Sequence, residues 1–272
     1  MKPGMRVPMA VRARRIERPL PGASCPHLVL TDQGWYVVKW LQNPQNPRVV
    51  ANEAIASELL SHLGIRRPDW AMVQVDQEVC TRERARAADK ISAHIKPGWH
   101  FGSEFPGAPD TLSGKETSLS LHLEQIENTS DLLNVLAFDI WVDNVDRRQT
   151  ILVDEGDVLV AQVIDNGSIF GFEDTTTTHI PRPHFSHPCL PRSLYSNWSF
   201  ADIAGRIAGT TEEHIRCIVN STPPEWLSVG RVNIDTLVGN LMQRGRNISE
   251  LIAQCIECWN HHPRSELDTR PE

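Results

Sequence analysis

The first third of the chain contains short apolar runs rich in β-branched and aromatic residues, a pattern typical of strands. LVLTDQ (28–33) and WYVVKWL (35–41) lie on either side of Gly34, which predicts a hairpin. WAMVQVD (70–76) and ISAHI (91–95) predict two more strands. We therefore expect this part of the chain to form a sheet.

One helix is predicted within this strand-rich part. NEAIASELLSHLG (52–64) places four apolar side chains on one face, and Gly64 is the kind of residue that commonly follows a helix C-terminus. After it, the segment 96–114 is crowded with Gly and Pro, which favour turns over regular structure. We interpret that segment as a connector.

Beyond the connector, a helical spacing of apolar residues dominates. The exception is a predicted hairpin of TILV (150–153) and VLVAQVID (158–165), turned by an acidic EGD. The predicted class is α+β, with an N-terminal lobe at 1–95, a connector at 96–114 and a mostly helical lobe at 115–272. The predicted helices are 119–126, 130–142, 200–209, 212–220 and 234–259, the last either long or broken.

Composition and charge narrow the function classes. A hydrophobic content of 40% and a charged content of 22% are typical of globular proteins, and a net charge of −7 makes direct nucleic-acid binding an unfavoured interpretation. Neither a membrane-length apolar run nor a signal-peptide core occurs, so we expect a cytoplasmic protein. Six scattered cysteines fit a reducing compartment, where we expect free thiols.

The N-terminus is locally basic. Only Glu17 opposes the six cationic residues of this region, and we interpret it as a frayed, solvated segment in preference to a phosphate-binding arm. The cationic residues are Lys2, Arg6, Arg12, Arg14, Arg15 and Arg18.

The stretch FDIWVDNVDRRQTILV (138–153) raises the question of catalysis, because it places DNVDRR between a helix and a strand. The following hairpin would hold the carboxylates of Asp146 and Asp165 at one end of a small sheet. A pair of acids so placed, with a cation such as Lys39 on an upstream strand, is the minimum equipment for metal-assisted phosphoryl transfer. Glu53 is a plausible partner for Lys39.

Five motifs in this order resemble those of the HipA-like kinase family. They are GASCPHLV, WYVVKW, NEAIASELLSHLGI, FDIWVDNVDRR and VIDNGSIFG, and PPEW (223–226) fits the helical end of the family. The resemblance spans about residues 16–255. It implies a two-lobed protein-kinase-like fold that uses ATP and magnesium to phosphorylate a Ser or Thr of a protein. It also implies a toxin role with a small DNA-binding antitoxin as partner.

The resemblance assigns roles by position. The phosphate loop falls on Gly22, Ala23 and Ser24, and the phosphate-pairing lysine and its helix glutamate fall on Lys39 and Glu53. The catalytic loop provides Asn144 and the candidate base Asp146. The metal-binding aspartate is Asp165.

The sequence departs from the family at a second metal ligand. Relatives carry an Asn five residues after the catalytic aspartate, where this chain has Ile151, or Thr150 if one residue is deleted. Asn144, Asn166 or Gln149 would then supply an oxygen to magnesium. The phosphate loop is also sparse in glycine. Two alternatives therefore stay open: a pseudokinase that binds nucleotide or a partner without turnover, and a small-molecule kinase.

Other polar residues have weaker interpretations. Arg147 and Arg148 are expected either to contact substrate or to pair with nearby acids, and Asp143 to be structural. Near the C-terminus, a Cys-x-x-Cys with adjacent histidines lacks a second pair and lies on the apolar side of a predicted helix, which favours packing over zinc binding. That cluster is Cys255, Cys258, His261 and His262.

Overall fold

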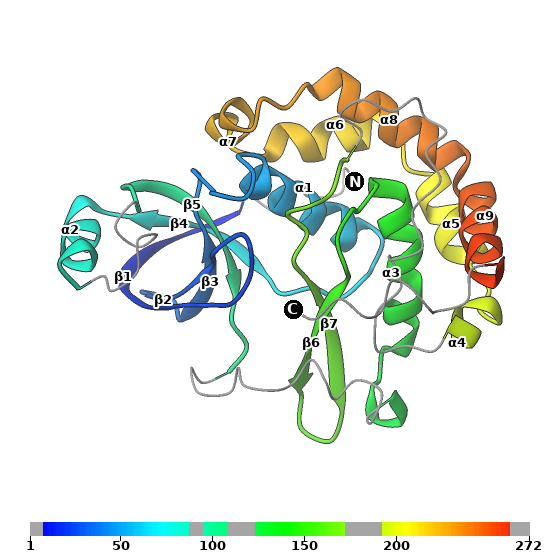
Figure 1. The fold of residues 1–272 in the computed structure, drawn as a ribbon, viewed down its shortest axis with the longest axis horizontal. Helices are drawn as coiled ribbons and strands as arrows, with labels where there is room; N and C mark the ends of the chain where they lie inside the picture. Colours follow the sequence, from blue (N-terminus) through cyan, green and yellow to red (C-terminus); the bar gives the residue numbers. More distant parts are fainter. Residues whose placement is uncertain (1–7, 87–94, 108–122, 172–191, 262–272) are drawn as a thin grey trace, which may run out of the picture. The chain divides into compact units, whose positions relative to one another are not determined.

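The computed structural model describes residues 8–86, 95–107, 123–171 and 192–261, which form parts of two compact units (Figure 1). We call them the strand-rich unit and the helical unit. Each is assembled from separate stretches of chain. The strand-rich unit comprises Met1–Leu59, Pro68–Ser113 and Cys217–Val232, and the helical unit comprises Leu60–Arg67, Gly114–Arg216 and Asn233–Glu272. This mixture of strands and helices confirms the predicted α+β class.

Five strands of the strand-rich unit close into a barrel in the order β1-β2-β3-β5-β4. The predicted hairpin is present as the antiparallel pair β2–β3, with Gly34 at φ 132° in its turn. The barrel closes where β1 runs parallel to β4. The strands are β1 Met9–Pro19, β2 His27–Thr31, β3 Trp35–Lys39, β4 Trp70–Val75 and β5 Gly98–Glu104.

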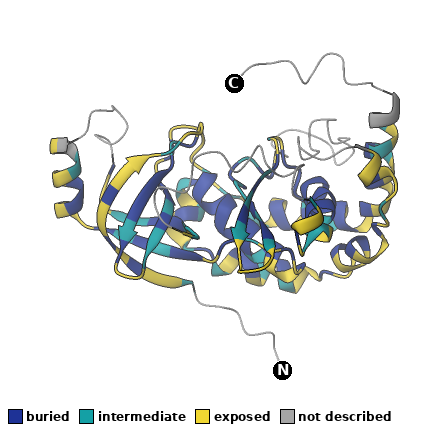
Figure 2. Cartoon of the chain, turned by 90° about the horizontal axis from the view of Figure 1, so that it is seen from below, coloured by how far each residue is buried: buried dark blue, intermediate teal, exposed yellow. Residues whose placement is uncertain are grey.

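Side chains alternate across the barrel wall, as the two-residue period of a strand requires. Val11, Val38 and Val73 are almost fully buried in one apolar cluster, whereas the arginines of β1 are exposed. In Figure 2 the barrel strands accordingly carry buried residues beside exposed ones.

Two strands differ from the sequence prediction. The expected frayed, basic N-terminus is wrong for residues 9–19, because β1 buries Val11, Ala13 and Ile16 between its exposed arginines. Two register shifts interrupt the two-residue alternation, which hid the strand in the sequence. The segment taken as a connector contains β5, which pairs with both β3 and β4. Of the strand predicted at 91–95, residues 91–94 lie outside the described part of the chain.

Helix α1 (Val49–His62) packs against the barrel and begins earlier than predicted. The Asn46 side chain accepts the backbone N–H of Arg48 at 2.8 Å, just before the helix starts. Val50, Ala51 and Ala54 of α1 share an apolar cluster with Trp226 of α7 (Pro224–Val229). The unit also contains α2 (Gln77–Arg86), which sequence patterning did not predict.

The helical unit is organised around α3 (Thr129–Val142), whose residues from Val135 to Val142 are all buried. Helices α5, α8 and α9 and strand β7 pack on α3. The predicted hairpin is present as β6 (Gln149–Asp154) and β7 (Leu159–Ile164). The remaining elements are η4 Leu123–Gln125, α4 Arg192–Ser196, α5 Ala201–Ala208, α8 Ile234–Arg246 and α9 Ile248–His261. Helix α6 (Glu212–Ser221) begins in the helical unit and ends in the strand-rich unit.

Two helix predictions change in detail. The predicted helix at 234–259 is two helices, α8 and α9, which meet at Asn247. Of the predicted helix at 119–126, the described part is only the single turn η4. Within the described ranges, no helix combines the length and the apolar character needed to cross a membrane.

Gly102 of β5 is required by packing inside the barrel. A Cβ on this residue would lie 2.5 Å from Cγ2 of Val73 and 3.2 Å from Cδ1 of Tyr36. We expect Gly102→Ala to lower the free energy of unfolding by about 1–3 kcal/mol, because overpacking forces the core apart. Urea denaturation measures the change. The control is Gly205→Ala on α5, where no atom outside the adjacent helix backbone lies within 4 Å of the added Cβ. That variant is expected to gain roughly 0.5–1 kcal/mol as a helical alanine.

Candidate active site

A buried ion pair joins the barrel to α1 in the strand-rich unit. Lys39, the last residue of β3, donates from Nζ to Oε1 of Glu53 at 2.5 Å, and the two side chains are 8% and 4% exposed. Glu53 lies in the second turn of α1, beyond the first turn in which the helix dipole favours an acid. A charge-paired lysine on a strand is the arrangement that kinases use to hold phosphates.

The predicted phosphate loop connects β1 to β2 as a tight turn. The N–H of Leu20 donates to the carbonyl of Pro26 at 2.8 Å, and the N–H of Cys25 donates to the carbonyl of Gly22 at 3.0 Å. Gly22 has φ 128°, a conformation that favours glycine. Gly22 and Ala23 are exposed, whereas Ser24 is buried.

Asn43 fixes this loop, and sequence reasoning missed it. Its buried Nδ2 donates to the carbonyl of Ser24 at 2.8 Å. Asn43 follows β3 in an NPQNP stretch that sequence patterning described only as a loop. The loop and the segment after Lys39 are therefore held together by one side chain.

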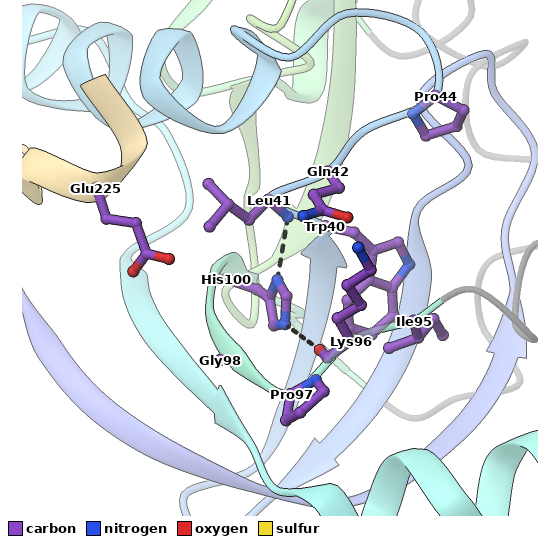
Figure 3. Close-up of a pocket in the computed structure, with 10 residues that line it drawn as sticks. All are labelled: Trp40, Leu41, Gln42, Pro44, Ile95, Lys96, Pro97, Gly98, His100 and Glu225. Carbon is purple, nitrogen blue, oxygen red and sulfur yellow. Dashed lines mark hydrogen bonds between the residues drawn. The ribbon is translucent and has the colours of Figure 1, made fainter. Parts of the chain in front are cut away.

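A cavity of about 180 Å³ lies elsewhere in the strand-rich unit (Figure 3). Trp40, Lys96, His100 and Glu225 are among its lining residues, and none of the predicted phosphate-binding residues lines it. His100 accepts the N–H of Leu41 on Nδ1 at 3.0 Å and donates from Nε2 to the carbonyl of Lys96 at 3.0 Å. Burial lowers the pKa of His100 to about 4. The imidazole is therefore neutral at pH 7.

In the helical unit, the candidate catalytic loop begins where α3 ends. Asp143 adopts a left-handed conformation at φ 51° and turns the chain out of the helix. Asn144 is buried, donates from Nδ2 to Oδ1 of Asp139 at 3.0 Å, and accepts the N–H of Asp146 at 3.1 Å. Asn144 thus positions Asp146 from inside the loop. Asp146 is half-buried and accepts the N–H of Arg147 on Oδ1 at 2.8 Å.

The most deeply buried charges of this site are Asp139 and Arg148, which form an ion pair with both side chains at 0% exposure. Burial raises the pKa of the Asp139 carboxyl, and the guanidinium of Arg148 opposes that rise. Arg148 therefore pairs with an acid, one of the two interpretations that the sequence left open. Sequence reasoning missed Asp139, whose only signal was a carboxylate within the apolar run FDIW.

The candidate metal loop follows β7. Asp165 is half-buried, with φ 59° in the left-handed region, which aspartate tolerates. Asn166 is buried, and its Oδ1 accepts from Nη1 of Arg148 at 2.8 Å. Gln149 lies opposite Ile164 in the hairpin register and is half-buried. Of the three predicted metal ligands, Asn166 thus has its oxygen engaged with a guanidinium.

Asp165 is a candidate protein ligand for a divalent ion that binds together with a phosphate-bearing molecule. Over the described ranges, no three His, Cys, Asp or Glu side chains gather in a way that could hold a metal. Magnesium is commonly bound by one or two carboxylates together with substrate phosphates, so a complete protein cage is not required. Asp165 would supply the carboxylate of such a site.

Backbone hydrogen bonds join the catalytic loop to the metal loop. The N–H of Val145 donates to the carbonyl of Ser168 at 3.1 Å, and the N–H of Phe170 donates to the carbonyl of Val142 at 2.8 Å. The hydroxyl of Ser168 lies 3.5 Å from Oδ2 of Asp146. The sequence prediction that Asp146 and Asp165 share one end of the hairpin thus has a structural counterpart in two directly bonded loops.

The side chain of Arg244 in α8 contacts the end of α3, where the catalytic loop begins. Its Nε lies 3.1 Å from the carbonyl oxygens of Ile140 and Trp141, and its Nη2 lies 3.5 Å from Oδ1 of Asp143. The last turn of a helix has carbonyls without helical partners, which a cation satisfies. Asp143 therefore contacts a structural arginine, as expected of a structural residue.

The C-terminal cysteines lie on α9. Cys255 is buried and Cys258 is half-buried. Burial, with a smaller contribution from Cys258, raises the pKa of the Cys255 thiol to about 12, so this sulfur is protonated at pH 7. The side chain of His261 and the whole of His262 fall outside what the structure describes.

A strand lysine paired with a helix glutamate, together with two bonded loops that carry aspartates, corresponds to the equipment of a kinase. The comparison with protein families agrees: residues 14–249 match the model of the HipA-like kinase family, and the chain belongs to that family. The family predicted from the sequence motifs is confirmed.

Similar solved structures include the proinflammatory kinase CtkA of Helicobacter pylori, with 12% identity and a TM-score of 0.49. That match covers 93% of this chain and 99% of CtkA. The Golgi casein kinase with Mn/ADP bound has 12% identity and a TM-score of 0.47, covering 94% of this chain and 74% of its own. None of the curated proteins compared with the chain matches it.

The charges of the Lys39–Glu53 pair can be removed singly or together, which measures how far charge compensation contributes to stability. We expect Glu53→Leu to lower the free energy of unfolding by about 3–5 kcal/mol, because it leaves a buried ammonium without its carboxylate. The double variant Lys39→Met with Glu53→Leu is expected to recover most of that loss. Chemical denaturation of the two variants checks this. If the double variant were as unstable as the single one, the pair would contribute more than charge compensation.

His100 makes stability depend on pH in a defined window. Its folded pKa of about 4 lies below the ordinary 6.5, so the unfolded chain binds the proton more readily between these values. The free energy of unfolding should therefore have its full value above pH 6.5 and fall by about 3 kcal/mol as the pH drops to 4. The side chain in His100→Gln does not titrate, so the free energy of unfolding of this variant should fall by correspondingly less over the same pH range. Parallel slopes for both proteins would contradict the assignment.

Proposed function

We propose that this protein is an ATP- and magnesium-dependent kinase that transfers the γ-phosphate to a Ser or Thr hydroxyl of a protein. Membership of the HipA-like kinase family supports a phosphotransferase. The observation that carries the proposal is the bond between the loops of Asp146 and Asp165, through the Val145 N–H and the Ser168 carbonyl at 3.1 Å. This bond gives a base and a metal-binding carboxylate a fixed relation.

Asp146 is the proposed group that accepts or orients the acceptor hydroxyl. Its carboxylate is only half-buried, so a substrate can reach it, and its backbone N–H is held by buried Asn144. Phosphoryl transfer depends mainly on positioning and charge stabilisation, so a base with a fixed backbone suits the chemistry.

The phosphates of ATP are assigned to the strand-rich unit. Lys39, oriented by Glu53, supplies a positive charge, and the exposed backbone of Gly22 and Ala23 offers N–H groups. Asp165 would hold magnesium, which neutralises phosphate charge when bound. The protein acceptor, the toxin role and the antitoxin partner rest on the resemblance to the family.

One observation favours a second function, a nucleotide-binding protein without turnover. Ile151 stands where relatives carry a magnesium-binding Asn, and its side chain cannot ligate magnesium. Thr150, which takes that position if one residue is deleted, is only 1% exposed. A chain that binds ATP normally and transfers no phosphate would have this second function.

Two variants test the proposed function. Asp146→Asn should abolish transfer from radiolabelled ATP, by roughly a thousandfold or more, while ATP still raises the melting temperature as in wild type. Asp165→Ala should lose the extra thermal stabilisation that magnesium adds to ATP. Equal loss of ATP binding in Asp146→Asn would assign that residue to metal binding or structure. Absence of any shift in the wild type would overturn nucleotide binding itself.

A further inference from the structure

Arg148 forms hydrogen bonds with both sequence neighbours of Asp165. Its Nη1 donates to the carbonyl of Ile164 at 3.0 Å and to Oδ1 of Asn166 at 2.8 Å, the residues before and after Asp165. Asp165 is in the left-handed region at φ 59°, and these two hydrogen bonds flank it in the chain. One nitrogen atom therefore contacts the backbone of the residue before the candidate metal-binding carboxylate and the side chain of the residue after it.

The same guanidinium is tied to the catalytic loop. Arg148 Nε and Nη2 donate to the two oxygens of Asp139, and Oδ1 of Asp139 also accepts from Asn144. Asn144 in turn receives the N–H of Asp146. A continuous path of hydrogen bonds, buried except at the Asp146 N–H, thus runs from the candidate base to the candidate metal loop.

In protein kinases this connection is made partly by metal. Two magnesium ions are held there by the metal-loop aspartate and a catalytic-loop asparagine, so the ions link the two loops. Here the position of that asparagine is Ile151 or buried Thr150, and Oδ1 of Asn166 already accepts from a cation. The side-chain oxygen at that position is therefore replaced or buried, and the oxygens of Asn144 and Asn166 both accept protein hydrogen bonds, which leaves Gln149 among the amides considered.

We propose that this protein uses a single divalent ion, and that Arg148 takes over the loop-linking role of the second. Arg148 is a positioning residue: its side chain is buried among protein groups and acts by fixing the segment around Asp165. This inference rests on the proposed function, since it concerns the metal that accompanies ATP. With a single ion, catalysis does not require a metal ligand at the position of Ile151.

Metal stoichiometry is the first test. Electron paramagnetic resonance of Mn²⁺, titrated into protein with one equivalent of the non-hydrolysable analogue AMP-PNP, counts bound ions without requiring activity. We expect one Mn²⁺ per chain at saturation. Two ions with the analogue bound would overturn the single-ion inference and leave the proposed function standing. No binding of either would overturn the proposed function and the inference together.

The second test concerns Arg148 itself. Asp139→Asn with Arg148→Met removes both buried charges while keeping an acceptor for Asn144, which avoids an unpaired buried ion. In this folded double variant we expect the dissociation constant of Mn²⁺ to rise roughly tenfold or more, as is usual when the support of a ligand is lost. Arg246→Met, at an exposed arginine of α8 outside the site, is the control and should bind Mn²⁺ like wild type. Unchanged Mn²⁺ affinity in a double variant with a native circular dichroism spectrum would overturn the positioning role.

Discussion

The buried ion pair of Asp139 and Arg148 is the interaction on which the site of the helical unit depends. Two charges removed from water are tolerated only when each is opposed and hydrogen-bonded, which restricts them to very few geometries. Asp139 meets this condition with Arg148 and Asn144, and Arg148 meets it with Asp139, Asn166 and a backbone carbonyl. The positions of the catalytic loop and the metal loop therefore depend on the buried carboxylate of Asp139 in α3.

The strand-rich unit also contains a buried ion pair. Lys39 and Glu53 are also buried and paired, but they join a strand to a helix instead of one loop to another. Ion pairs of this kind add little to stability compared with apolar packing, because desolvation offsets most of the attraction. Each candidate cluster thus contains a buried ion pair that fixes an arrangement of charges. The surrounding apolar clusters carry the stability.

The sequence allowed prediction of the parts that follow local rules. Lys39 and Glu53 lie on a strand and a helix whose periodicities are readable, and the β6–β7 hairpin follows from two apolar runs and an acidic turn. Asp139 was missed because a single carboxylate in an apolar helix resembles the polar side of an amphipathic one. Its partner Arg148 lies beyond a loop whose path no periodicity describes. Strand β1 was missed because its bulges interrupt the alternation.

The barrel has a consequence for how the chain is made. Its apolar surface is completed by Trp226, whose indole donates to the carbonyl of Trp99 at 3.2 Å, and Arg48 donates to the carbonyl of Gly230 at 3.0 Å. These contacts join residues 127 and 182 positions apart. Synthesis proceeds from the N-terminus at roughly 5–20 residues per second, so the barrel emerges from the ribosome many seconds before α7. During that interval the apolar surface that Trp226 will cover is exposed to water, so this part of the core is completed only after α7 has been synthesised.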